Sequence, residues 1–119
     1  MRKIVLFVLA TLGAATPAFA GQSPTVDRTG YTAIAAGDLS AAEQRIVAER
    51  KIFPQRPELM LNLASVYLRT GRAQEARSLY AAVLDRPAVA MDLPSGAVVS
   101  SHDLASRALA RQPQQIATR

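Results

Sequence analysis

Apolar side chains recur at helical spacing in the middle of the chain, beginning after Pro57. They fall at positions i, i+3, i+4, i+7 and i+8 of one segment, namely Met60, Leu63, Ala64, Tyr67 and Leu68. Such a stripe predicts a helix with one buried face. Pro57 suits the first helical position because its missing N–H would be unpaired there anyway. We expect Gly71 to end this helix, since glycine adopts the left-handed cap conformation without strain.

The segments on either side have the same spacing and predict two further helices. The positions expected to share a face are Leu39, Ala42, Ile46, Arg50 and Phe53 before it, and Ala73, Ala76, Tyr80, Val83 and Leu84 after it. Ser40 with Glu43 has the pattern of a capping box, in which both side chains hydrogen-bond to backbone N–H groups of the first turn. The first of these helices should end at Phe53–Pro54, because a residue before proline avoids the helical conformation, and the second at Pro87.

Both flanks of these three helices also carry structural signals. A short helix from about Val26 to Ala36, ended by Gly37, is predicted in front of them. Behind them, the alternation and turn signal of residues 88–99 predict a short β-hairpin. Ser100 and Asp103 are expected to begin a final helix that closes the core, and residues 112–119 to form a flexible tail.

Two pairs of small residues share one period. The interval from Gly37 to Gly71 is the same as the interval from Ala42 to Ala76. Such an interval, roughly 34 residues, is typical of helix–turn–helix solenoid repeats. Small residues at such positions allow two helices to approach closely.

Residues 57–87 resemble a tetratricopeptide repeat. The family's pattern of large, small and aromatic positions corresponds here to Met60, Leu63–Ala64, Tyr67, Ala76, Tyr80 and Pro87. The resemblance implies a mainly α fold with about two antiparallel helix–turn–helix repeats, approximately 25–56 and 57–87. The first is degenerate, because Gly30 and Ala33 stand where a small residue and tyrosine are expected. With the hairpin and capping helix of 88–111, these repeats would form one domain over 25–111.

Residues 1–20 are predicted to be a secretory signal peptide rather than part of the fold. Arg2 and Lys3 precede an apolar run from Ile4 to Leu12, and Ala18–Ala20 offers small residues for cleavage before Gly21. The run is too short for a spanning helix, and an uncleaved anchor is the alternative. Residues 21–24 would be a lead-in, and no later segment is predicted to cross a membrane.

The composition agrees with a small exported bacterial protein. Loss of Arg2 and Lys3 with the signal peptide would lower the net charge from +5 to +3, which does not by itself imply nucleic acid. The chain has no cysteine, whereas small secreted eukaryotic domains are usually stapled by disulfides. We therefore expect a periplasmic or secreted location.

No residue pattern predicts reaction chemistry. His102 is the only histidine, which with the missing cysteine excludes a metal site rich in nitrogen or sulfur ligands. The run from Ser100 to Asp103 suits a helix cap with a solvent-facing histidine, because consecutive helical side chains diverge by about 100° and cannot form a triad. We expect no enzyme, no cofactor and no metal.

The resemblance instead implies a groove for a protein or peptide partner in the cell envelope. The first helix of each repeat lines the groove in this family, and the corresponding candidates are Tyr31, Ile34, Glu58, Leu61, Ser65, Leu68 and Arg69, with Asp27 and Ala35 at further positions. If Ile34, Leu61 and Leu68 are exposed, they make an apolar strip for a peptide or helix. The alternative is that the C-terminal segment covers them.

A second hypothesis assigns function to basic residues. Arg45, Arg50, Lys51 and Arg56 follow one another along the second predicted helix and its exit. They could bind an anionic envelope polymer or an acidic protein surface, or form an ordinary solvated face paired with nearby glutamates. Two repeats are fewer than the three that usually bury a continuous core, so an uncovered end could also pair two copies of the chain.

Overall fold

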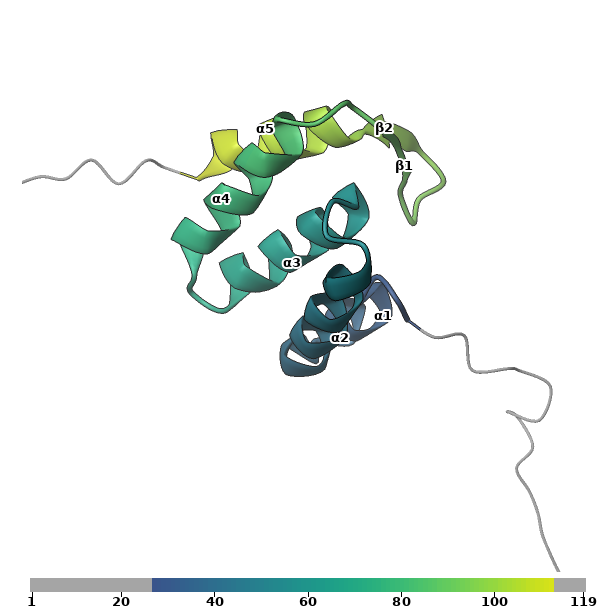
Figure 1. Ribbon diagram of the computed structural model, residues 1–119, viewed down its shortest axis with the longest axis vertical. Coiled ribbons are helices and arrows are strands. Elements are labelled where there is room, and N and C mark those ends of the chain that lie inside the picture. The colour runs from purple at the N-terminus through teal and green to yellow at the C-terminus, as the bar shows by residue number, and fades with distance from the viewer. Residues whose placement is uncertain (1–26, 113–119) are drawn as a thin grey trace, which may run out of the picture.

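The structure is a computed structural model that describes residues 27–112. Within this part of the chain the fold is mainly helical, with five helices and a two-stranded hairpin (Figure 1). In chain order the elements are α1 (Tyr31–Ala35), α2 (Leu39–Ile52), α3 (Pro57–Arg69), α4 (Ala73–Leu84), β1 (Ala90–Asp92), β2 (Val98–Ser100) and α5 (Ser101–Arg111). None of these helices is long and apolar enough to cross a membrane.

The three central helices form where the apolar spacing predicts them. Pro57 occupies the first turn of α3, and Gly71 follows α3 with a φ of 81°. The helix α2 ends at Ile52, with Phe53 as its C-cap before Pro54. Phe53 is 43% exposed, so the prediction that it shares one face with Ala42 and Ile46, which are fully buried, is wrong. A cap residue has left the helical path, and its side chain no longer follows the helix periodicity.

The predicted helix over 26–36 is mostly a turn. Only Tyr31–Ala35 is helical, while Gly30 has a φ of 74°. The carboxylate of Asp27 accepts a hydrogen bond from the backbone N–H of Ala33 at 3.0 Å, which stabilises the turn instead of a longer helix. The expected start at Val26 and the whole of segment 1–26 lie outside the described residues.

The start of α2 also differs from the prediction. Asp38 is the N-cap, and its carboxylate accepts a hydrogen bond from the N–H of Ala41 at 3.1 Å. Ser40 is already helical and exposed, so it does not cap. Glu43 points away from the helix start to Arg72, 29 residues further on. The predicted capping box of Ser40 and Glu43 is therefore wrong, because Asp38 occupies the N-cap position and its carboxylate accepts the hydrogen bond.

The core has two parts that meet on α3, the helix at the centre of Figure 1. The first part joins α1 and α2 to one face of α3 through Ala33, Ile34, Ala42, Ile46, Leu59, Leu63 and Val66. The second joins α4 and α5 to the other face through Met60, Leu61, Ala64, Ala76, Tyr80, Val83 and Ala105. Because Ala42, Ala64 and Ala76 are all fully buried, they are positions where small side chains let helices approach closely.

The predicted hairpin and final helix are both present and are joined to each other. Met91 pairs with Val99 at the centre of the antiparallel hairpin. The N–H of Val89 donates to Ser101 Oγ at 2.9 Å, and the N–H of Ser101 donates to the carbonyl of Val89 at 2.8 Å. Ser100 caps α5 by accepting from the N–H of His102.

His102 does not face solvent as predicted. Its Nε2 atom lies 2.5 Å from the carbonyl oxygen of Arg86, and the side chain is half-buried. A carbonyl oxygen only accepts, so the hydrogen of the ring resides on Nε2. The histidine thus ties the first turn of α5 to the exit of α4, which supports a structural role.

Candidate functional site

A concave surface runs along α3 between α1 on one side and the hairpin and α5 on the other. It consists of two adjoining hollows of about 470 and 510 Å³, which share Leu61, Asn62, Leu93 and Leu104. Each hollow has a size usual for ligand sites. We call this surface the concave groove; its remaining lining residues are Thr29, Tyr31, Glu58, Ser65, Leu68, Tyr80, Met91, Asp92, Pro94, Ala108, Arg111 and Gln112.

The helix α5 takes the place that the first helix of a third repeat would occupy. It packs mainly on α4 and touches α3. Along the groove, Leu104 lies near the middle of α3, while Ala108 and Arg111 lie with Ser65 and Leu68 further along it. Therefore α3 and α5 run in the same direction, as the first helices of successive repeats do in a solenoid.

Five of the seven predicted groove residues line this surface, and they are Tyr31, Glu58, Leu61, Ser65 and Leu68. The other two are engaged elsewhere. Ile34 belongs to the core between α1, α2 and α3. Arg69 donates from Nη1 to the carbonyl oxygen of Ile34 at 3.4 Å, which anchors the end of α1.

The apolar strip expected from Ile34, Leu61 and Leu68 is not open. Ile34 and Leu61 are each only 9% exposed, and Leu68 packs half-buried against the second core. Leu61 was expected either to be exposed or to be covered by the C-terminal segment, and in the structure the C-terminal segment packs around it. Leu61 forms the floor of the groove rather than a protruding contact.

The C-terminal segment supplies a wall of the groove that sequence reasoning did not assign to it. Met91 and Leu93 come from the hairpin, and Leu104 and Ala108 from α5. Their spacing was visible as strand alternation and helical periodicity. That signal predicts that these side chains face inward, but it does not say that they stop beside Leu61 instead of closing over it.

The end of the groove near α1 is fixed by a polar contact. The Asn62 amide donates from Nδ2 to the carbonyl oxygen of Thr29 at 2.9 Å, which holds the turn before α1 against α3. Beside it, Glu58 Oε1 lies 3.9 Å from Arg56 Nε. The other oxygen, Glu58 Oε2, is buried and has no hydrogen-bond partner.

The end near the C-terminus of α5 carries hydrogen-bond donors. Arg77 donates to the side-chain oxygen of Gln112 at 3.3 Å and to its carbonyl oxygen at 3.2 Å, which leaves the amide nitrogen of Gln112 buried without a partner. Arg111 also lines this end. Burial raises the pKa of the Tyr80 phenol, and the nearby positive charge of Arg111 offsets part of that rise, so Tyr80 stays neutral at physiological pH.

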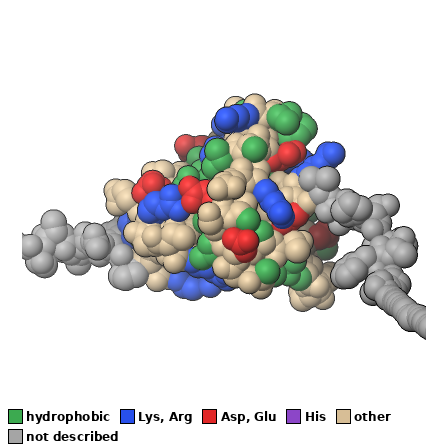
Figure 2. All heavy atoms as spheres, turned by 90° about the horizontal axis from the view of Figure 1, so that it is seen from below, with side chains coloured by type: hydrophobic (Ala, Val, Ile, Leu, Met, Phe, Trp, Pro, Cys, Tyr) green, Lys and Arg blue, Asp and Glu red, His purple; other side chains and the backbone are tan. Residues whose placement is uncertain are grey.

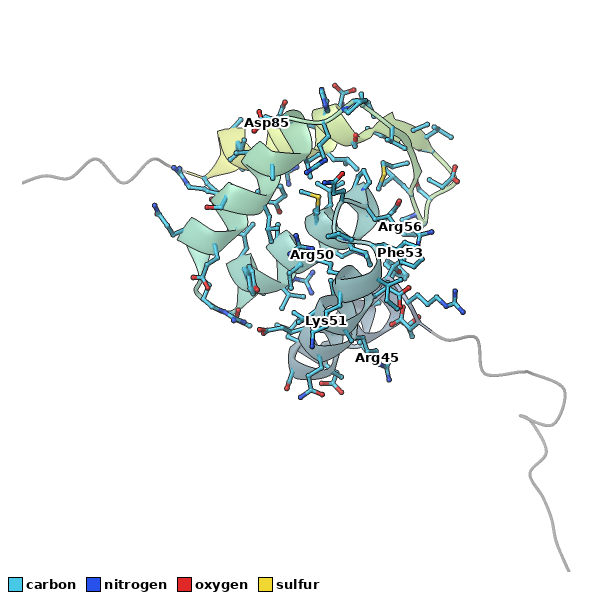
Figure 3. The ribbon with its side chains drawn as sticks, viewed as in Figure 1. Arg45, Arg50, Lys51, Phe53, Arg56 and Asp85 are labelled. Atoms are coloured by element: carbon cyan, nitrogen blue, oxygen red, sulfur yellow. The ribbon has the colours of Figure 1, made fainter. Side chains whose placement is uncertain are left out.

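The four residues of the predicted basic face do not converge (Figure 3). Arg45 lies 3.5 Å from Asp27, and Arg50 donates to the carbonyl of Pro54 at 3.4 Å. Arg56 stacks over the Phe53 ring at 5.1 Å while facing Glu58. Figure 2 shows one face of the molecule, on which basic side chains are interspersed with acidic and apolar ones.

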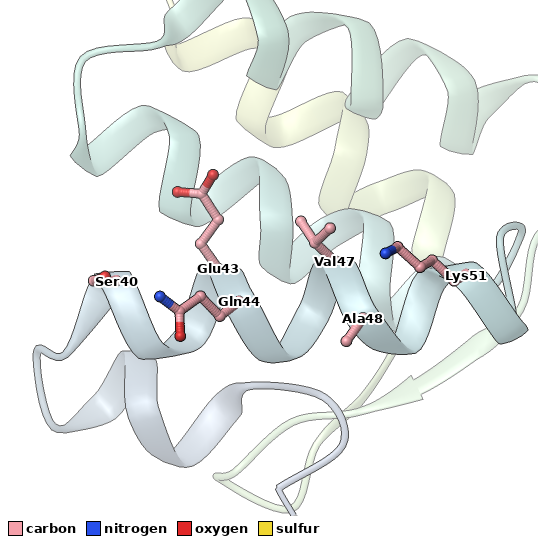
Figure 4. Close-up of a pocket in the computed structure, with 6 residues that line it drawn as sticks. All are labelled: Ser40, Glu43, Gln44, Val47, Ala48 and Lys51. Carbon is pink, nitrogen blue, oxygen red and sulfur yellow. The ribbon is translucent and has the colours of Figure 1, made fainter.

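Lys51 has a different setting from the three arginines. It lies at one end of a shallow hollow along the outer face of α2, together with Ser40, Glu43, Gln44, Val47 and Ala48 (Figure 4). This hollow follows a single helix face and brings together one lysine and one glutamate. It offers no concentration of charge for an anionic polymer.

Residues 27–112 contain no grouping of histidine, cysteine, aspartate or glutamate side chains that could hold a metal ion. Comparison with protein families matches residues 33–89 to the tetratricopeptide repeat, a span that runs from α1 to the residue before β1. Modules of this kind generally mediate protein–protein interaction and are usually non-catalytic. No curated protein and no solved structure is significantly similar to the chain.

Proposed function

We propose that the tetratricopeptide repeat of residues 33–89 makes this protein a periplasmic or secreted adaptor without catalytic activity. It binds a peptide or helix of another cell-envelope protein in the concave groove. One observation carries the proposal: α1, α3 and α5 face one continuous hollow whose floor is apolar, from Leu61 to Leu68, and whose rim is polar. An apolar floor with a few polar groups at its margin suits a protein segment.

The envelope location rests on residues 1–20, which have the charge, apolar run and cleavage residues of a signal peptide. The test is to express the full chain with a C-terminal tag in a Gram-negative host and to measure the intact mass in each cell fraction. A periplasmic protein that starts at Gly21 is expected. Uncleaved protein in the cytoplasm or the membrane fraction would exclude the proposed processing.

Site-specific photo-crosslinking tests the groove directly. Ser65 lines the groove and is half-buried, whereas Gln44 is exposed on the outer face of α2. A photoreactive amino acid at Ser65 is expected to trap a discrete partner in living cells, while the same probe at Gln44 does not. Equal trapping at both positions, or trapping at Gln44 alone, would show that the partner does not use the groove.

The runner-up function, binding of an anionic envelope polymer or acidic surface, would use Arg45, Arg50, Lys51 and Arg56. The local contacts of the three arginines weaken this candidate, because each already meets a carboxylate or a carbonyl oxygen. It predicts that Lys51→Glu and Arg50→Glu together abolish partner capture at low salt. The groove hypothesis predicts that capture survives this double change.

Self-association is the remaining partner hypothesis. The outer face of α2 has no further repeat packed on it within the described residues, and Val47 is exposed there. Sedimentation equilibrium of the processed protein distinguishes a monomer from a dimer. A dimer that the change Val47→Glu dissociates would favour pairing through this end.

A further inference from the structure

The two ends of the concave groove carry opposite charge. The hollow beside α1 and the hairpin is lined by two carboxylates, Glu58 and Asp92, and by no basic residue. The hollow beside the end of α5 is lined by Arg111 and by no acidic residue. Asp92 and Arg111 are both exposed, and neither forms an ion pair within residues 27–112. Both charges are therefore available to a bound segment.

The buried polar atoms that have no hydrogen-bond partner also differ between the two ends of the groove. At the acidic end the atom without a partner is Glu58 Oε2, a hydrogen-bond acceptor. At the basic end it is Gln112 Nε2, a donor. Buried polar atoms are almost always hydrogen-bonded, because an unmade bond costs more than a made bond contributes. A bound segment that offers a donor at one end and an acceptor at the other satisfies both atoms.

The surface between the two ends is apolar. Its side chains are Leu61, Leu68, Leu93, Leu104 and Ala108. From Glu58 to Leu68 the groove follows ten residues of α3, which span about 15 Å at 1.5 Å per residue. An extended segment covers that length in about five residues at roughly 3.3 Å each.

We propose that the concave groove recognises a bipolar segment: a basic residue at the Glu58–Asp92 end, an apolar centre, and a carboxylate at the Arg111 end. This inference rests on the proposed function and specifies the partner's chemistry. The carboxylate comes from an acidic side chain of the partner. Complementary charge at both ends gives the segment a single direction in the groove and disfavours segments with like charge at both ends.

Three synthetic peptides test the proposal with the processed protein at low salt. Each is six residues long, with the centre Leu-Ala-Leu-Ala and blocked ends, and the outer residues are Lys and Glu, Lys and Lys, or Glu and Glu. Chemical shifts of the protein report weak binding and its location. The Lys–Glu peptide is expected to bind about three- to fivefold more tightly than either other peptide, the effect of one exposed ion pair. A fourth peptide has Lys first and a free C-terminal carboxylate in place of Glu, and tighter binding of this peptide would show that the groove takes a C-terminus instead of an acidic side chain.

Charge-reversal variants make the test specific to the residues. The change Asp92→Lys places a lysine beside the remaining Glu58 carboxylate and should remove the preference for the Lys–Glu over the Glu–Glu peptide. The change Arg111→Glu reverses the charge of the other end and should transfer preference to the Lys–Lys peptide. Asp103→Lys and Arg107→Glu are the matched controls, because both residues are exposed on α5 and do not line the groove. The controls should leave the preference unchanged.

The outcomes separate this inference from the proposed function. Binding in the groove without charge preference, or preference unchanged by Asp92→Lys and Arg111→Glu, overturns the bipolar specificity but leaves a peptide-binding groove. Absence of any shift along α3 with all peptides at millimolar concentration overturns the bipolar specificity as well. In that case crosslinking at Ser65 still decides on its own whether the groove holds a partner.

Discussion

Arg72 holds Glu43 with both ends of its guanidinium group and so connects the turn before α4 to α2. Nη1 donates to Oε2 at 3.0 Å and Nη2 donates to Oε1 at 2.5 Å. The same guanidinium lies over the ring of Tyr67 at 4.5 Å and donates from Nε to Thr70 Oγ1 at 3.1 Å. One arginine thus joins the second helix of the first repeat to the turn of the second repeat.

This ion pair should make stability depend on acid pH. Hydrogen bonds from Arg72 hold the pKa of the Glu43 carboxyl below its ordinary range, with the charge of Arg72 adding to this and burial opposing it. A carboxyl whose pKa is lowered by folding stabilises the fold above its unfolded pKa, about 4.3. That contribution is lost as pH falls through the lower, folded pKa.

We therefore expect Glu43→Gln to unfold at lower urea concentration than the wild type at pH 7, with the difference shrinking toward zero well below pH 4. Equilibrium urea unfolding across this pH range measures it. Glu49→Gln on the same helix is the control, because Glu49 forms no ion pair within residues 27–112. A difference that stays constant with pH would show that Glu43 does not act through its charge.

Glu43 also shows where reasoning from sequence reaches its limit. Its position three residues after Ser40 satisfies a local rule, and local rules predicted α2 to α5 and the hairpin correctly. The actual partner, Arg72, lies 29 residues away and is brought near only when the two repeats pack. The same limit applies to the groove: four of the five predicted positions on α3 line it, whereas Arg69 bonds to the end of α1. The wall from Met91 to Ala108 depends on packing between distant segments.

Gly30 is a second position that the chain alone did not explain. A Cβ atom there would lie 2.6 Å from Cγ1 and 2.7 Å from Cδ1 of Ile46, which is fully buried. The absence of a side chain thus lets the turn before α1 lie directly on α2. The family pattern expects a small residue at this position, and the geometry restricts it to glycine.

Gly30→Ala should accordingly destabilise the fold by about 2–4 kcal/mol, which combines overpacking with the strain of a positive φ. Gly71→Ala isolates the strain, because its φ is 81° but nothing lies within 4 Å of the added Cβ atom. Thermal and urea unfolding of both variants measures the difference. Adding Ile46→Val to Gly30→Ala should recover part of the loss; equal effects of the two glycine substitutions would refute the close contact.

Ser101 joins the hairpin to α5 and is fully buried. In Ser101→Ala the part-buried N–H of Val89 loses its acceptor, and loss of such a hydrogen bond should lower the free energy of unfolding by about 0.5–1.5 kcal/mol. Because the hairpin forms one wall of the groove, amide hydrogen exchange in β1 should also accelerate. Ser95→Ala in the exposed hairpin turn is the matched control and should change neither quantity. Unchanged exchange in β1 would show that Ser101 does not hold the hairpin in place.

Leu61 is the residue at which stability and binding must be separated. Leu61 is only 9% exposed and packs with Ala64, Tyr80 and Ala105. The change Leu61→Ala should therefore lower the free energy of unfolding by about 2–5 kcal/mol. The Ile52 side chain is 67% exposed, so Ile52→Ala should change the free energy of unfolding by no more than about 0.5 kcal/mol. Urea unfolding of the two variants tests this, and equal costs would mean that Leu61 is open to solvent. With the expected result, lost binding in a Leu61 variant reports a damaged core, so the groove is better probed at Asp92 and Arg111, which are exposed on its rim.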